Sequence, residues 1–170
     1  MKHLVLTVIA EDKTGLVEKI SNVVFAHEAN WLASNLSILS GYFAGVIEVM
    51  VPETQLAELQ KELSDLPGMQ ITTHLCEALE TKPAQDLELV ITGNDRKGIV
   101  QELSTVINHK GANIVSFVSS HQSAPNWGGE LFHAVAKVTL PEGMDPDVIV
   151  NALEQIASDI IVDIELEEAV

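Results

Sequence analysis

The feature that most constrains the fold of this chain is an internal repeat. Shifting the sequence by 83 positions, the distance from Gly15 to Gly98, places apolar residues on apolar ones and charged residues on charged ones. Self-similarity of this kind indicates two copies of one structural unit. The identical pairs include Leu4 and Leu87, Leu6 and Leu89, Asp12 and Asp95, Gly15 and Gly98, Ala29 and Ala112, and Asn30 and Asn113.

Both copies have the same order of predicted elements. Apolar residues alternate in the strands and recur at helical spacing in the helices. We predict strands at 4–9, 30–39, 42–51 and 69–76 and helices at 15–27 and 54–66, then strands at 87–92, 113–122, 130–140 and 160–167 and helices at 98–110 and 146–158. The order βαββαβ, found twice, predicts an α+β fold of two ferredoxin-like units. Each unit has a four-stranded antiparallel sheet with two helices on one face.

The boundary between the copies lies in a polar stretch that contains proline. We therefore predict a first unit at 1–76, a linker at 77–85 and a second unit at 86–170. The first strand of each copy is largely apolar at both alternating sets of positions, which is typical of a strand covered on both faces. Helices cover only one face of the sheet, so we expect the other face or an edge to pack against the sister unit or another subunit. A homodimer is therefore possible.

The charge of the chain argues against several classes of function. There are 9 basic and 25 acidic residues, a formal charge of −16, and such a surface repels nucleic acid and anionic lipid. No stretch resembles a secretion signal or a membrane span, so we expect a soluble cytoplasmic protein. No Ser-His-Asp, Cys-His or P-loop pattern occurs. We expect neither an enzyme nor a bound cofactor.

The most informative motif is the turn between the first strand and the first helix of each copy, which reads AEDKTGLV and then GNDRKGIV. Asp12 and Asp95 can cap the following helix, while Gly15 and Gly98 let another molecule approach the backbone. Free N–H groups in the first turn of a helix also favour an anion such as a carboxylate. By spacing alone, a plain helix cap with a tight turn is the alternative to a ligand site.

Two histidines raise the question of a metal site. His121 and His133 are equidistant from Trp127, so a hairpin centred there would place them opposite each other as two ligands. Strand histidines more often belong to a surface or pack a hairpin, and we predict no metal site. Trp127, on a long connection, indicates a contact surface unless it folds back onto its own sheet.

The turn, the helix and the following "AN" resemble the signature of ACT domains, amino-acid-sensing modules attached to many regulated metabolic enzymes. The matching stretches are EDKTGLVEKISNVV and NDRKGIVQELSTVI, and the resemblance covers nearly the whole chain, twice. It implies a ligand at an interface between two ACT units, in contact with this turn and with a strand of the partner unit. The ligand-binding residues that it implies are Asn94, Asp95, Gly98, Ile99 and Asn113 in the second copy and Asp12, Gly15, Leu16 and Asn30 in the first.

The two copies depart from the ACT signature to different degrees. The first copy has Glu28 where the second has Gly111, at a bend where the family usually has glycine or another small residue. It also has Ala10-Glu11 where the second copy has Gly93-Asn94. We therefore predict that the second turn is the better ligand site and that the first is a structural copy.

The resemblance also implies a function. Because two ACT-like units account for the sequence, we expect a regulator that acts through other proteins. In length, acidity and turns the chain is similar to the tandem ACT repressors of glycine cleavage genes in proteobacteria. This resemblance implies a small amino acid as ligand, with glycine the first candidate. It also implies a DNA-bound transcription activator as the partner, so that the protein itself does not bind DNA. The alternative is a free-standing amino-acid-sensing subunit of a metabolic enzyme.

Overall fold

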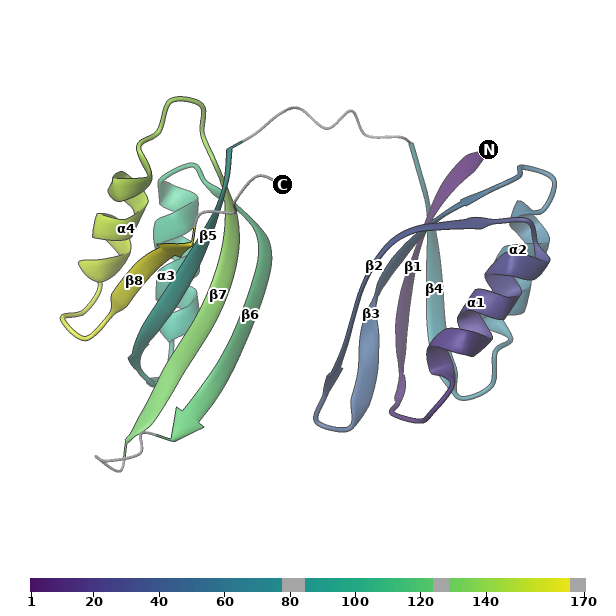
Figure 1. Cartoon of the computed structure of the whole chain (residues 1–170), viewed down its shortest axis with the longest axis horizontal. Coiled ribbons are helices and arrows are strands. Elements are labelled where there is room, and N and C mark those ends of the chain that lie inside the picture. Colours follow the sequence, from purple (N-terminus) through teal and green to yellow (C-terminus); the bar gives the residue numbers. More distant parts are fainter. Residues whose placement is uncertain (78–84, 124–128, 166–170) are drawn as a thin grey trace. The chain divides into compact units, whose positions relative to one another are not determined.

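The computed structural model describes residues 1–77, 85–123 and 129–165. Internal contacts divide the chain into two compact units, Met1–Thr81 and Lys82–Val170 (Figure 1). Apart from its two end residues, the predicted linker 77–85 lies outside the described residues, as does Trp127. The expectation that the units pack against each other or against a second copy stays a prediction.

The first unit has the predicted βαββαβ order. Its strands form one antiparallel sheet in the order β2-β3-β1-β4, and both helices lie on one face of it (Figure 1). The elements are β1 (Lys2–Glu11), α1 (Leu16–Ala26), β2 (Asn30–Leu39), β3 (Tyr42–Val51), α2 (Leu56–Ser64) and β4 (Met69–Cys76).

The second unit repeats this topology with an antiparallel sheet in the order β6-β7-β5-β8. Helices α3 and α4 again cover one face (Figure 1). The elements are β5 (Gln85–Asn94), α3 (Ile99–His109), β6 (Asn113–Ser123), β7 (Glu130–Leu140), α4 (Pro146–Glu154) and β8 (Ile161–Glu165). The prediction of two ferredoxin-like units is confirmed.

Local sequence explains most element boundaries. Ser40 and Gly41 both have positive φ, 51° and 81°, as a two-residue hairpin turn of type I′ requires, and they join β2 to β3. Helix α2 begins at Leu56, later than predicted, because a turn comes first, in which the Gln55 N–H donates to the Pro52 carbonyl at 2.9 Å. Helix α4 begins after Asp145, whose carboxylate accepts from the Asp147 N–H at 3.0 Å.

Each unit has its own hydrophobic core between sheet and helices. In α1 the buried residues are spaced along one stripe, and in β1 every second residue is buried. Burying a Leu or Ile side chain of this kind stabilises the fold by about 1.5–3 kcal/mol. The fully buried large side chains are Leu4, Leu6, Ile20, Ile47, Leu59 and Leu63 in the first unit and Leu89, Ile91, Leu103, Ile107, Ile149 and Leu153 in the second.

The opposite face of each sheet carries no helix of its own unit. On β1 this face has the half-buried Val5 and Thr7 and the exposed Ile9, and on β5 it has Glu88 and Val90. Apolar and polar residues therefore mix on this face in both units.

The bend after the first helix of each unit needs a left-handed residue. Gly111 has φ 76°, and its counterpart Glu28 has φ 56°. A side chain in this region costs about 1–2 kcal/mol, which glycine avoids because it lacks a β-carbon. The backbone thus explains the glycine in the second copy and shows that Glu28 is strained.

Candidate functional site

The repeated turns place a glycine, and no capping side chain, at the start of each first helix. Gly15 and Gly98 are the N-cap residues, with φ 85° and 87°, and no side chain hydrogen-bonds either helix start. The prediction that Asp12 and Asp95 cap the helices is therefore wrong. Each aspartate lies three residues before the N-cap, and the left-handed glycine turns the chain between them.

In the second unit, Asp95 is held at the end of the sheet by bonds to both strands of the β6–β7 hairpin. Its N–H donates to the carbonyl of Glu130 at 2.9 Å. Its carboxylate Oδ2 lies 3.2 Å from Nδ1 of His121, and 22% of the Asp95 side chain is exposed. A negative charge is thus fixed in a half-buried position beside the start of α3.

A hollow of about 360 Å³ lies next to this carboxylate. One side is formed by the turn and the first residues of α3, from Asp95 to Gln101, and the other by Ser119, His121 and Phe132 of the hairpin. Phe132 is 2% exposed and belongs to the core, so it gives the hollow a firm apolar floor. The hollow therefore joins a helix start, a carboxylate and an apolar surface.

The electrostatics of the hollow differ from one wall to the other. Arg96 donates two hydrogen bonds, of 2.7 and 2.6 Å, to Glu102, which lowers the pKa of that carboxyl and ties up the guanidinium. At the start of α3, the N–H groups of Val100 and Gln101 have no intrahelical acceptor and no capping side chain. These donors and the positive end of the helix dipole favour an anionic group, while Asp95 favours a cationic one. The site suits a small zwitterion.

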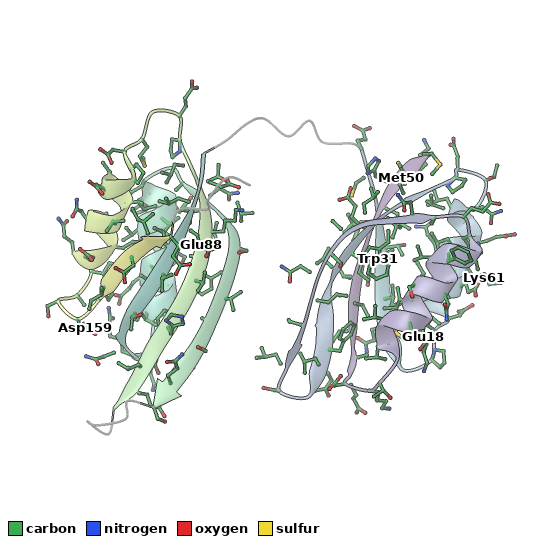
Figure 2. The ribbon with its side chains drawn as sticks, in the orientation of Figure 1. Glu18, Trp31, Met50, Lys61, Glu88 and Asp159 are labelled. Carbon is green, nitrogen blue, oxygen red and sulfur yellow. The ribbon has the colours of Figure 1, made fainter. Side chains whose placement is uncertain are left out.

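The structure brings together three of the five candidates in the second unit. Asp95, Gly98 and Ile99 border the hollow. Asn94 does not, and its N–H donates to Oδ2 of Asp159 at 2.8 Å, near the end of β5 (Figure 2). Asn113 begins β6 beyond the other end of α3, where it lines a separate hollow with Asn108.

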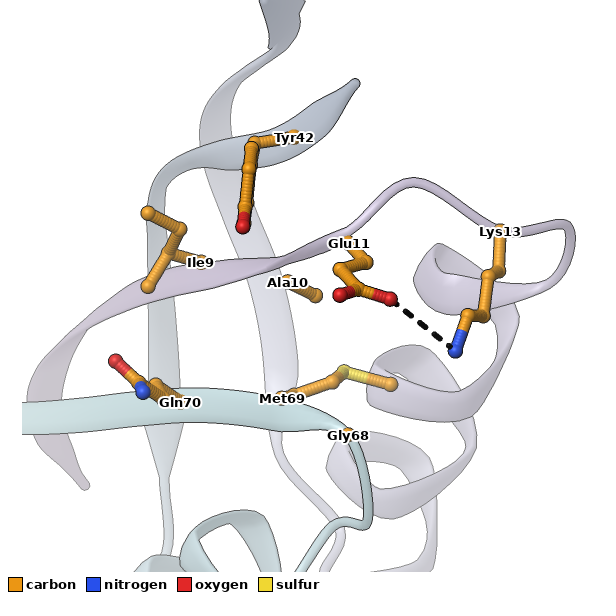
Figure 3. Close-up of a pocket in the computed structure, with 8 residues that line it drawn as sticks. All are labelled: Ile9, Ala10, Glu11, Lys13, Tyr42, Gly68, Met69 and Gln70. Atoms are coloured by element: carbon orange, nitrogen blue, oxygen red, sulfur yellow. Dashed lines mark ion pairs between the residues drawn. The ribbon is translucent and has the colours of Figure 1, made fainter. Parts of the chain in front are cut away.

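The first-unit candidates do not border a hollow at the end of that unit's sheet. This hollow, of about 600 Å³, is lined by the ends of β1 and β4 and by Tyr42 (Figure 3). Asp12, Gly15, Leu16 and Asn30 are all absent from its lining. Its charged groups are an exposed pair, Glu11 and Lys13, 3.8 Å apart, which satisfy each other. It is larger than the hollow beside Asp95, but its lining contains no N–H groups from the start of a helix. We therefore favour the hollow beside Asp95 as the ligand site.

Sequence reasoning missed the hairpin residues of the second hollow. His121 lies opposite Phe132 and faces the helices, whereas His133 lies opposite Ser120 on the other face. The interpretation that the two histidines oppose each other is wrong, because a register shift of one residue moves a side chain to the other face. His133 instead lies 3.4 Å from Oγ1 of Thr92. The spacing of charged residues gave no signal for the pairing of His121 with Asp95.

Among the residues that the structure describes, no helix has the length and apolar character needed to cross a membrane.

Comparison with known proteins identifies the fold. Residues 2–79 match the family model of the ACT domain. The crystal structure of an unknown protein from Galdieria sulphuraria superposes on this chain with a TM-score of 0.83. The two sequences are 28% identical, and the match covers 96% of this chain and 97% of that chain. A candidate glycine cleavage system transcriptional repressor is 15% identical, covers 96% of each chain and has a TM-score of 0.72. No curated protein sequence matches significantly.

These likenesses extend over both units, and the second unit repeats the topology of the first strand by strand. Residues 2–79 thus match the ACT domain family model, and the chain as a whole is a tandem repeat whose fold is similar to that of these two structures.

Proposed function

We propose that this chain is an amino-acid-responsive regulatory protein whose ligand binds in the hollow beside the second turn. The observation that carries the proposal is the pairing of opposite electrostatic preferences across one small site. The uncapped N–H groups of Val100 and Gln101 suit a carboxylate, and the fixed carboxylate of Asp95 suits an ammonium group. An α-amino acid carries both groups on adjacent atoms.

The ligand is a small amino acid, with glycine as the first candidate. A β-carbon placed on Gly98 meets no atom within 4 Å, so the backbone there is open to an approaching ligand. The floor formed by Phe132 is packed in the core, so a ligand would rest on it without entering the core. A ligand without a side chain makes the fewest demands on such a site.

The regulatory output is repression through a protein partner. A likeness in fold to a candidate glycine cleavage repressor supports this form of the proposal, and the formal charge of −16 supports a partner other than DNA. No lysine or arginine follows Lys137 in the sequence, while Glu142, Asp145 and Asp147 are exposed beside α4. This acidic surface suits the basic surface of a DNA-bound activator, which it would reach by electrostatic steering.

Calorimetric titration of glycine, serine and alanine into the full chain, in buffer with a chelator, tests the ligand. We expect glycine to bind, and Asp95→Asn to weaken binding by at least about tenfold because a charge-assisted hydrogen bond is lost. Asp12→Asn, the matched change in the first unit, should leave binding unaltered. If Asp12→Asn abolishes binding while Asp95→Asn preserves it, the ligand binds in the first unit and the proposed site is wrong.

A mobility-shift titration at low salt tests the partner. The protein alone should form no complex with glycine cleavage promoter DNA, and it should alter the mobility only when the DNA-bound activator is present. Affinity capture from a cell lysate, followed by identification of the captured protein, distinguishes the alternative, because a regulatory subunit would capture a metabolic enzyme. Tight binding to promoter DNA by the protein alone would rule out this mechanism.

A further inference from the structure

Three side chains with metal-binding atoms converge at the rim of the second-unit hollow. They are Asp95, which follows β5, His121 near the end of β6, and Glu130 at the start of β7. Their ligand atoms all lie within 4.8 Å of one another. Among the residues that the structure describes, these three form a group of His, Asp and Glu side chains close enough to share an ion.

The backbone explains why the three side chains meet. The Asp95 N–H donates to the Glu130 carbonyl at 2.9 Å, which fixes the first and third residues side by side. His121 lies opposite Phe132, two positions along β7 from Glu130, and alternate residues of a strand point to the same face. All three therefore emerge on the helix-covered side at one end of the sheet, where sheet hydrogen bonds hold their backbones.

The distances fit a metal ion with little rearrangement. In a tetrahedral zinc site with bonds of about 2.0–2.1 Å, two ligand atoms lie about 3.4 Å apart. Nδ1 of His121 and Oδ2 of Asp95 are already 3.2 Å apart. Glu130 is exposed, so its carboxylate is free to rotate the remaining distance.

The charges at this corner also favour a cation. Two carboxylates stand beside one imidazole, and the nearest guanidinium does not neutralise them because Arg96 is bonded twice to Glu102. An ion bound between Asp95 and Glu130 would relieve their mutual repulsion. One imidazole nitrogen with two carboxylate oxygens is a ligand set for borderline divalent metals such as zinc, whereas magnesium prefers oxygen ligands alone.

The first unit provides an internal control. Its hairpin makes the equivalent backbone contact, since the Asp12 N–H donates to the Gly41 carbonyl at 2.9 Å, and Ile38 lies opposite Phe43. Ile38 and Gly41 thus occupy the places of His121 and Glu130, and only the aspartate remains. The cluster is therefore a feature of the second unit and is not required by the fold.

We propose that Asp95, His121 and Glu130 bind a divalent transition-metal ion of the zinc class, with the remaining coordination position open beside the hollow. This site shares the Asp95 carboxylate with the amino acid proposal, so a metal ion and an ammonium group would compete for it, but the metal site is tested without any amino acid present.

Titration of Zn²⁺ into the full chain, free of any histidine tag and stripped with a chelator that is then removed, tests the proposal. Wild type should bind one equivalent. His121→Ala and Glu130→Gln should each weaken binding by more than about 100-fold, since loss of an outer-shell partner alone costs 10–100-fold. His133→Ala and Cys76→Ser, matched changes away from the cluster, should leave the affinity unchanged. A large excess of Mg²⁺ should not displace the zinc.

Both variant residues are exposed, so thermal unfolding of His121→Ala and Glu130→Gln without metal should match that of wild type. The proposal is overturned if wild type binds no Zn²⁺, if both variants retain wild-type affinity, or if Mg²⁺ competes on equal terms. Glycine titration of the same metal-free variants gives a separate result, so a missing metal site and a missing amino acid site are distinguishable.

Discussion

The two units share a backbone contact at the end of the sheet and carry different side chains beside it. In both, the aspartate after the first strand donates its N–H to the next hairpin at 2.9 Å, and a left-handed glycine starts the first helix. The hairpin positions beside that aspartate are Ile38 and Gly41 in one unit and His121 and Glu130 in the other.

This difference teaches that a repeated fold is not a repeated site. The glycines and buried aliphatic residues recur because the backbone and the core require them in each unit. Positions at the exposed end of the hairpin meet no such requirement and are free to differ. Ligand chemistry in this chain is therefore expected from the second unit alone.

The largest expected effect tests whether the two cores are equivalent. Leu6 and Leu89 occupy matching positions in central strands, and both are 0% exposed. Leu6→Ala and Leu89→Ala should each lower the free energy of unfolding of their unit by about 2–5 kcal/mol, through lost burial and the cavity left behind. Urea unfolding followed by circular dichroism measures both. A loss below about 1 kcal/mol for one of them contradicts the equivalence.

The next comparison separates stability from binding at the two turn glycines. Neither glycine would place a β-carbon closer than 3.8 Å to another atom, so alanine costs mainly backbone strain, with a net loss of about 1 kcal/mol in each case. Gly98→Ala should also weaken glycine binding by tenfold or more, whereas Gly15→Ala should not. Chemical denaturation and calorimetry measure the two effects. Equal effects on binding would remove the distinction between the units.

A smaller change concerns the bend after the first helix. Glu28→Gly should stabilise the first unit by about 0.5–1 kcal/mol, because relief of strain at φ 56° exceeds the entropy lost by adding a glycine. Gly111→Ala should destabilise the second unit, since its φ is 76° and the new β-carbon would lie 3.3 Å from Pro141. Thermal unfolding checks both signs. A destabilised Glu28→Gly would show that the bend is not strained.

The smallest expected effect is a pH dependence caused by His27 in the first unit. His27 is 8% exposed, and its ring nitrogens lie 2.7 Å from Glu62 and 3.1 Å from Gln55, contacts that raise the pKa of His27 above its usual value. The stabilisation is complete below about pH 6.5 and is lost as pH rises through the raised pKa. The free energy of unfolding of this unit should therefore fall as the pH rises above about 6.5.

Glu62→Gln should flatten this pH dependence, because the carboxylate is the main cause of the raised pKa. The second unit has Lys110 in place of His27, so it lacks this pair of an imidazole and a carboxylate. Urea unfolding at a series of pH values checks the prediction. An unchanged slope in Glu62→Gln would mean that another group titrates.

The sequence predicted the strands of the first unit closely because their signals are local. Strands β2, β3 and β4 have the predicted bounds, since the Ser40-Gly41 turn and Pro67-Gly68 stop each run at a definite residue. The start of α2 is less well predicted, because the turn before it has a helix-like sequence. For the candidate site, the sequence pointed to the turn and Gly98, which border the hollow of the second unit, but the helix cap expected of Asp95 is not formed.

Sequence by itself determined the number of units, their βαββαβ order and the apolar faces that form the cores. Each of these depends on neighbouring residues or on a fixed period along the chain. Only the tertiary structure decided that His121 meets Asp95 and Glu130 while His133 faces away. The register of a long hairpin is set by strand pairing and core packing, and a shift of one residue exchanges the two faces.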